Sequence, residues 1–202
     1  MVGEAVIAVL WHKQPRIGEL PEGTTLLPGP GLLLAARYQS SPMGAFNELT
    51  IFAPARTGFA IGLFATLTVV NAPLDAQGVP TWEGAHRQLG SIGWTSDGDT
   101  VCVTWAERAL ELRAVKSGAA LPFLLPIRTL VHGRRAAALP LRGLGHLARV
   151  TCVLAHGDEL APLSTVRRGI VVSAQQLGWR SATEAIHSTI WGPGTAPVPG
   201  IG

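Results

Sequence analysis

The stretch from Leu32 to Ala53 reads LLLAARYQSSPMGAFNELTIFA. Its first part, Leu32–Tyr38, is an apolar run typical of a buried strand, and the Ser, Pro and Gly residues at 40–44 indicate a turn. From Phe46 onward the side chains alternate with a period of two, which predicts a second strand. One face of that strand carries Phe46, Glu48, Thr50 and Phe52.

Short strands recur on both sides of this stretch. Residues 59–70 are β-branched and aromatic, and the link at 54–58 before them predicts a hairpin. Asp97-Gly98 lies between two further runs and predicts a second hairpin. Other strand candidates are 5–10, 108–115 (where a short helix also fits), 130–131, 136–141, 148–154 and 170–174. This regular spacing predicts a mostly β fold, either a barrel or a sandwich.

The length of 202 residues suits one domain, which we expect to span residues 1–191. Residues 192–202 are rich in Gly and Pro and are expected to form a flexible tail. Hydrophobic residues make up 47% of the chain and charged residues 14%. So little charge predicts that some apolar surface is buried between subunits of a homo-oligomer or lines an internal pocket.

Several classes of function are disfavoured by the composition. The arginines are scattered without interleaved aromatic residues, so no nucleic-acid partner is expected. Cys102 and Cys152 lie in apolar runs, which indicates buried thiols, and the histidines lack ligand spacing, so no metal or cofactor is expected. The longest apolar stretch is shorter than a membrane span and no signal peptide is recognisable, so we expect a cytoplasmic protein without a membrane partner.

Lysine is nearly absent from the chain. Lys and Arg together number 16, and only Lys13 and Lys116 are lysines. Both lie in polar surroundings beside Pro or Gly, which favours solvated amines with ordinary pKa values. Any mechanism that needs a neutral lysine amine therefore has two poor candidates.

Two segments resemble the acetoacetate decarboxylase family. Residues 38–48 match its pattern of Tyr, Ser-Pro, Gly, aromatic, Asn and Glu, with Glu48 at the position of the family's pocket glutamate. Residues 69–94 are similar to its active-site segment, with Trp82 and then His86-Arg87 where the family has Pro-Lys. The 39 positions from Glu48 to Arg87 fit the family's spacing, and the resemblance extends over residues 32–103.

The resemblance implies an antiparallel β-barrel or cone with a few short helices and a pocket for a small keto or carboxylate substrate. It places Glu48, Arg87 and His86 in catalytic roles, and it implies contacts with substrate for Tyr38, Phe46, Trp82 and Met43. The family's additional pocket arginine has two candidates here, Arg16 and Arg37.

Arginine at position 87 changes the implied chemistry. Family decarboxylases form an imine through a neutral lysine amine, whereas a guanidinium keeps its proton and can only bind an anion. We therefore expect an enzyme that acts on a β-keto or polyketide-like molecule by acid/base and electrostatic catalysis, as a cyclase, dehydratase or lyase of secondary metabolism. Two alternatives stay open: a non-catalytic small-molecule-binding relative, and a true acetoacetate decarboxylase whose lysine lies elsewhere.

Overall fold

The computed structural model describes residues 2–13, 20, 22–40, 44–71, 87–131, 135–153 and 158–174. Strands make up nearly all of this part of the chain, as predicted, and its two helical segments are short 3₁₀ turns, η1 (Ala106–Arg108) and η2 (Asp158–Thr165). None of the helices in these ranges has the length and apolar character needed to cross a membrane. The strands are β1 (Val2–His12), β2 (Thr24–Leu26), β3 (Gly29–Ser40), β4 (Phe46–Thr57), β5 (Ala60–Val70), β6 (Arg87–Leu89), β7 (Ile92–Asp97), β8 (Thr100–Trp105), β9 (Leu110–Val131), β10 (Arg135–Val153) and β11 (Arg168–Ala174).

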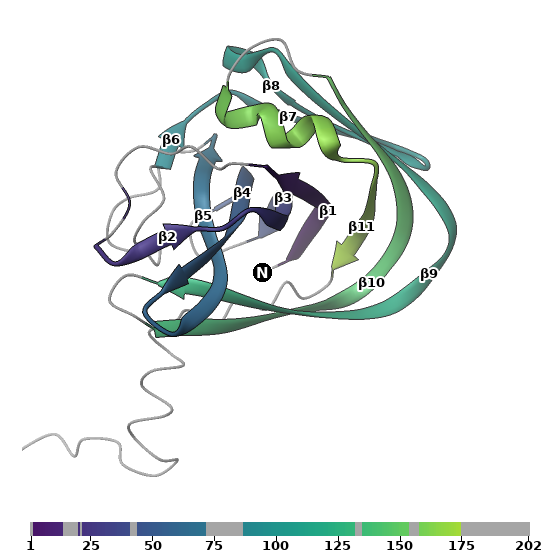
Figure 1. Cartoon of the computed structure of the whole chain (residues 1–202). Coiled ribbons are helices and arrows are strands. Elements are labelled where there is room, and N and C mark those ends of the chain that lie inside the picture. The colour runs from purple at the N-terminus through teal and green to yellow at the C-terminus, as the bar shows by residue number, and fades with distance from the viewer. Residues whose placement is uncertain are drawn as a thin grey trace, which may run out of the picture.

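The strands form one strongly curled sheet. Their order is β6-β5-β4-β3-β1-β11-β10-β9-β8-β7, with β2 paired to β4 off this path. Neighbouring strands in the described ranges are antiparallel except at β5–β6 and at a single β5–β9 pair, Leu63 with Thr129. That pair connects β9 back to β5, so that seven strands form a ring, and Figure 1 shows β9 and β10 sweeping round beneath the other strands. The predicted barrel-like architecture is confirmed.

The predicted hairpin at Asp97-Gly98 is confirmed. Asp97 pairs with Thr100, and Gly98 begins the two-residue loop with a positive φ of 53°, which a glycine adopts without a steric penalty.

The β4–β5 hairpin also forms, but its turn lies later than predicted. Residues 54–57 extend β4, and the loop is Gly58-Phe59. Pro54 is tolerated because β3 pairs with β4 only as far as Phe52 and β2 pairs with it only from Ala55. The missing N–H therefore falls between two partner strands.

β9 and β10 are much longer than the short strands that the sequence predicted there. They pair continuously apart from one irregularity, from Glu111 with Val153 to Val131 with Arg135. Prolines and glycines within them look like strand ends in the sequence. Pro126 pairs with Pro140, however, so the two absent N–H groups fall at one place in the ladder and pairing continues beyond it.

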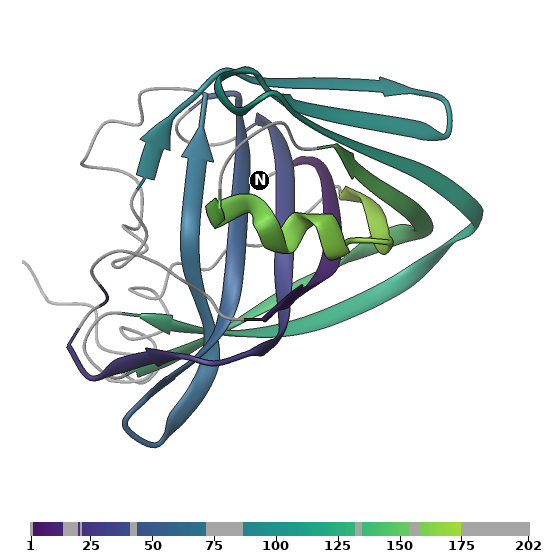
Figure 2. The ribbon, with the colours of Figure 1, turned by 45° about the horizontal axis from the view of Figure 1, so that its top comes forward.

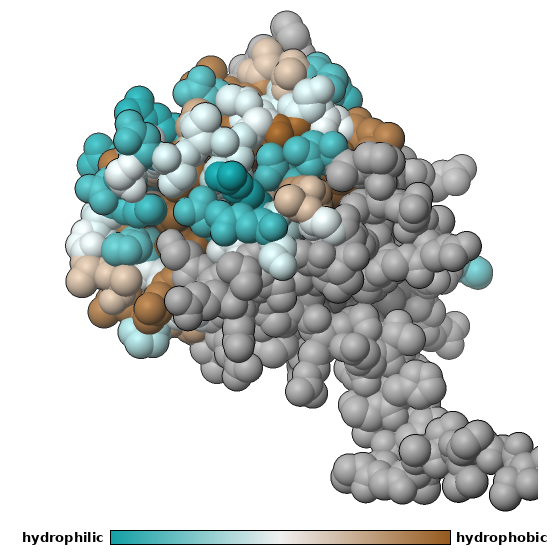
Figure 3. Space-filling model, turned by 180° about the vertical axis from the view of Figure 1, so that it is seen from behind, coloured by the Kyte–Doolittle hydropathy of each residue, from teal (hydrophilic) through white to brown (hydrophobic). Residues whose placement is uncertain are grey.

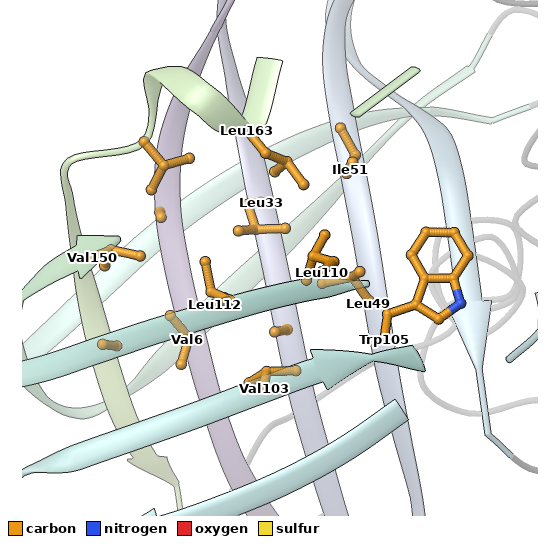
Figure 4. Packing of buried hydrophobic residues seen from close by; sticks show 14 of the residues in the cluster. Val6, Leu33, Leu49, Ile51, Val103, Trp105, Leu110, Leu112, Val150 and Leu163 are labelled. Atoms are coloured by element: carbon orange, nitrogen blue, oxygen red, sulfur yellow. The ribbon is translucent and has the colours of Figure 1, made fainter. Parts of the chain in front are cut away.

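The sheet buries both of its faces. One face, here called the helix-side face, carries Leu33, Leu49 and Ile51 toward β7, β8, the first part of β9 and η2 (Figures 2 and 4). Each of these side chains is almost fully buried, and burial of one leucine or isoleucine contributes about 1.5–3 kcal/mol. The core on this face also includes Val6, Leu67, Val69, Val103, Trp105, Leu110, Leu112, Val150, Leu160 and Leu163.

The opposite face, here called the Glu48 face, has a second core that Phe123 of β9 helps to cover. Its buried members are Ala5, Ile7, Leu32, Leu34, Ala36, Tyr38, Phe46, Phe52, Ala65 and Val172. Alternation along β4 places Glu48 and Thr50 on this same face, between Phe46 and Phe52. The candidate site is therefore part of an apolar wall.

The two cysteines are half-buried free thiols on β8 and β10, where the sequence had predicted buried thiols in strands. Burial raises the pKa of the Cys152 thiol to about 11, so this thiol stays protonated at neutral pH. Burial also raises the pKa of Cys102, and the neighbouring Glu111 carboxylate acts in the same direction.

Candidate functional site

Glu48 lies near the start of β4, with one strand on each side. Its neighbours in register are Ala36 of β3 and Val70 of β5. Side chains in register on adjacent strands share a face of the sheet. The carboxylate is therefore flanked by apolar residues and is itself only half-buried.

A pair of aromatic residues lies immediately beside this carboxylate. Tyr38 and Phe46 pair in register across β3 and β4, and their rings stack with centroids 4.4 Å apart and planes 29° apart. Both are buried, and Phe46 precedes Glu48 by two residues on the same face. The structure thus brings together three of the predicted site residues, Tyr38, Phe46 and Glu48.

Two buried threonines accompany the carboxylate. The Thr50 hydroxyl donates a hydrogen bond to Glu48 Oε1 at 2.7 Å, and Thr50 Oγ1 lies 3.3 Å from Thr68 Oγ1 on β5. Only 2% of Thr50 and 1% of Thr68 is exposed. A carboxylate in contact with shielded hydroxyls is oriented by the protein, because bulk water does not compete for these donors.

The backbone of Arg87 lies near the same threonines. Arg87 begins β6 and pairs with Thr68 in the parallel β5–β6 ladder, while Thr68 pairs with Thr50 on its other side. Position 87 therefore belongs to the cross-strand row that contains both threonines, and Glu48 lies in the adjacent row. The two positions predicted to share a site are close in the sheet.

Three of the predicted site residues lie outside the described residues: Met43, Trp82 and His86. Arg16, one candidate for an additional pocket arginine, also lies outside them.

Arg37, the other candidate, is not on the Glu48 face. It pairs with Asn47 and Glu4, one position away from the row that holds Ala36 and Glu48, so its side chain belongs to the helix-side face. The Trp94 indole N–H donates to Glu4 Oε2 at 3.1 Å on that side of the sheet. Arg37 is therefore excluded as a partner of Glu48 within this sheet.

Neither lysine lies on the Glu48 row. Lys13 is exposed just after β1, and Lys116 lies on β9, where its Nζ donates to the Gly98 carbonyl at 3.3 Å. Among the residues that the structure describes, no group of three His, Cys, Asp or Glu side chains could hold a metal ion.

Sequence reasoning missed the residues that secure the site. Thr50 was placed on the correct face, but Thr68 joins it only through cross-strand register. Asn71 was also missed: its Oδ1 accepts the Asn47 N–H at 2.7 Å, and Asn47 Nδ2 donates to the Ile92 carbonyl at 3.0 Å. These bonds hold the start of β4 against the end of β5 and the start of β7. The sequence offered one sign of these bonds: the polar residue Asn71 directly follows a valine-rich strand.

The curled, mostly antiparallel sheet has an acetoacetate decarboxylase-like β fold. Among solved structures, acetoacetate decarboxylase from Legionella pneumophila subsp. pneumophila str. Philadelphia 1 matches with a TM-score of 0.53 and 14% identity, over 85% of this chain and 81% of that one. An acetoacetate decarboxylase-like enzyme from Sphingomonas wittichii RW1 matches with a TM-score of 0.51 and 13% identity, over 85% of this chain and 90% of that one.

A third similar structure is MppR, an enduracididine biosynthesis enzyme, complexed with the condensation product of pyruvate and imidazole 4-carboxaldehyde. It matches with a TM-score of 0.53 and 14% identity, over 84% of this chain and 82% of that one. At these identities the likeness shows the fold alone. Comparison with protein-family models gives no match, and comparison with curated protein sequences gives none.

Proposed function

We propose that this protein is an enzyme that acts on a small keto acid or β-keto compound by acid/base and electrostatic catalysis, without an imine intermediate. The observation that carries the proposal is the Glu48 carboxylate, which is half-buried beside the stacked Tyr38 and Phe46 rings and held by the Thr50 hydroxyl. A carboxylate in apolar surroundings is suited to removing a proton from carbon.

In this proposal Glu48 removes a proton from the carbon next to the substrate carbonyl. The electron pair of that C–H bond moves onto the carbonyl oxygen and gives an enolate, and the proton stays on Glu48. Arg87, whose guanidinium remains charged and offers several donors, binds the enolate oxygen or the substrate carboxylate. The enolate then attacks an electrophile or expels a leaving group, which corresponds to a cyclase, dehydratase or lyase.

The other predicted residues have supporting roles in this proposal. Tyr38 and Phe46, with Trp82 and Met43, contact the substrate and keep water from the enolate. His86 returns a proton, since an imidazole titrates near neutral pH. The choice of a keto acid is supported by MppR, a protein of similar fold whose structure has been solved in complex with pyruvate.

The proposal is tested by hydrogen–deuterium exchange at the methyl group of pyruvate, followed by proton NMR in D2O. We expect the wild-type protein to accelerate exchange and Glu48→Gln to lower that rate by about 10²–10⁴-fold, the usual contribution of a general base. Thermal unfolding checks that the variant stays folded. Exchange no faster than in buffer would exclude the proposed proton transfer for this keto acid.

The alternative of a binding protein without catalysis is supported by the hydroxyl that already occupies Glu48 Oε1. If Glu48 and Arg87 only neutralise each other, replacing both by apolar residues will leave pyruvate affinity unchanged and stability unchanged or improved. A true acetoacetate decarboxylase would instead release carbon dioxide from acetoacetate, which a gas-release assay detects.

We also propose that the protein is a homo-oligomer. Exposed apolar side chains support this, because Val9 and Trp11 of β1 and Leu147 of β10 lie on one face of the sheet with much of their surface open. The described surface seen from behind mixes polar residues with apolar ones (Figure 3). Exposed apolar residues that share one face are typical of contacts between subunits.

A further inference from the structure

We infer that Thr68 and Thr50 form a two-hydroxyl chain that positions the Glu48 carboxylate and stabilises its ionised form. The inference rests on the proposed function, because it assigns positioning residues to the same site. Its geometric basis is a pair of oxygen–oxygen contacts made by Thr50 Oγ1, a short one of 2.7 Å to Glu48 Oε1 and a longer one of 3.3 Å to Thr68 Oγ1.

The direction of the chain follows from the number of hydrogens. An ionised carboxylate only accepts hydrogen bonds, and each threonine hydroxyl has one hydrogen to donate. The geometry has Thr50 as the donor of both contacts, to Glu48 Oε1 at 2.7 Å and to Thr68 Oγ1 at 3.3 Å, but Thr50 has a single hydrogen. When Glu48 is ionised, that hydrogen goes to the shorter, charged acceptor, and Thr68 then supplies the hydrogen of the longer contact. Bonds aligned in this way polarise each other, so the Thr68 hydroxyl strengthens the bond that Thr50 makes to the carboxylate.

Burial makes these hydroxyls unusual. Both threonines are almost fully buried on a face whose other core members are apolar, and Thr50 pairs in register with Leu34. A buried hydroxyl costs free energy unless it is hydrogen-bonded, and valine would fill the same volume. Hydroxyls that only fill space would be replaceable by valine without any effect on Glu48.

The chain also crosses the strand that separates Glu48 from Arg87. Thr68 lies on β5 and pairs with Thr50 of β4 on one side and with Arg87 of β6 on the other. Ala5 of β1, in the row of Glu48, is apolar. On β3 and β4, the other ionisable residues on this face among those that the structure describes are Tyr38 and Arg56, and Arg56 is exposed near the far end of β4. Within these strands, Thr50 donates directly to the carboxylate, and Thr68 contacts Thr50.

A matched control is available on the same strand. Thr57 of β4 is also buried, and its hydroxyl lies 3.0 Å from that of Thr24 at the far end of the sheet. Thr57→Val thus removes a threonine–threonine bond that is buried on the Thr57 side and partly buried on the Thr24 side, with no carboxylate attached.

The test is the titration of the Glu48 side-chain carboxyl in ligand-free protein, followed by carbon-13 NMR of glutamate-labelled protein and assigned by loss of the signal in Glu48→Gln. We expect Thr50→Val to raise the titration midpoint of Glu48 by roughly 0.5–1 pH unit, since it removes a donor to the charged form. Thr68→Val should raise it by less, Thr50→Ser should restore it, and Thr57→Val should leave it unchanged.

An unchanged midpoint in Thr50→Val, or an equal shift in Thr57→Val, would overturn the inference. If Thr50→Val does not fold, Thr68→Val and Thr50→Ser decide it by the same measurement. Because the titration needs no ligand, it is independent of the proposed function. If the wild type fails to bind pyruvate or to exchange the methyl protons of pyruvate, the proposed function is excluded. The hydroxyl chain is still tested by the titration midpoints of Glu48.

Discussion

Thr68 of β5 pairs in register with Arg87 of β6, in one of the few parallel contacts of a sheet that is otherwise antiparallel. Position 87 is thereby in register with a residue whose buried hydroxyl lies 3.3 Å from Thr50 Oγ1, and Thr50 in turn contacts Glu48. Position 87 belongs to the sheet itself, so its backbone is fixed by ladder hydrogen bonds. Substitution there changes the chemistry of the side chain more than the architecture.

Arg87→Lys should create an imine-forming protein. A lysine amine near an apolar wall has a lowered pKa and is partly neutral, whereas a guanidinium stays charged. With acetoacetate and borohydride, mass spectrometry should find no adduct on the wild type and a reduced adduct on residue 87 of the variant. Arg87→Gln is the control and should give none. An adduct on Lys13 or Lys116 of the wild type would contradict the absence of imine chemistry.

Asn71→Ala should loosen the start of β4. It removes Asn71 Oδ1, which accepts the Asn47 N–H at 2.7 Å. The Asn71 backbone N–H, which donates to the Asn47 carbonyl, stays in place. We expect the free energy of unfolding to fall by about 0.5–1.5 kcal/mol, the usual net value of one such bond. Chemical denaturation measures this change. Asn71→Asp keeps the oxygen acceptor and should lose less, and equal losses in the two variants would show that this bond does not stabilise the strand.

Alternation alone predicts the elements around Glu48. The apolar run of β3 and the polar–apolar alternation of β4 gave both strands and placed Glu48, Thr50 and Phe46 on one face. The Asp97-Gly98 pair gave the β7–β8 hairpin, because its turn geometry depends on local residues. Such features are encoded within a few positions of each other.

Features that depend on register could not be predicted in this way. The contact between Thr50 and Thr68 requires the β4–β5 pairing, which includes a bulge between Ile51 and Phe52. The orientation of Arg37 away from Glu48 requires the β3–β4 register. The long β9 and β10 strands were missed because Pro and Gly usually end strands, and only pairing with a partner shows that here they do not.

Trp11→Arg should weaken self-association. The Trp11 side chain is 54% exposed on the same face as Val9, and a charge there cannot be buried between subunits without a partner. Light scattering after gel filtration should give a multiple of 21.2 kDa for the wild type and a smaller mass for the variant. Phe59→Ser, which removes an exposed aromatic ring at the β4–β5 turn, is the control and should leave the mass unchanged. A wild-type mass of one chain would contradict the proposed oligomer.

His12 should make the fold sensitive to acid. Burial lowers the pKa of its imidazole below the ordinary value of 6.5, and the hydrogen bond of Nε2 to the Phe52 carbonyl, at 3.1 Å, opposes this only in part. Nδ1 is buried without a hydrogen-bond partner, and the ring lies against Gly31, where any Cβ would collide with it. A proton on Nδ1 would therefore add an unpaired charge to the protein interior.

The direction of the pH dependence follows from the two protonation states. The unfolded chain takes up the proton near pH 6.5, while the folded protein resists it to lower pH. The contribution of neutral His12 to the free energy of unfolding is therefore fully present above pH 6.5. It falls as the pH drops below this value, with a limiting slope of about 1.4 kcal/mol per pH unit. His12→Gln keeps a side-chain N–H for the Phe52 carbonyl and cannot be protonated in this range. Urea unfolding measures the free energy of unfolding at pH 7.5 and at pH 5.0. The decrease between these two pH values should be smaller in this variant than in the wild type, and equal decreases would assign the effect to other groups.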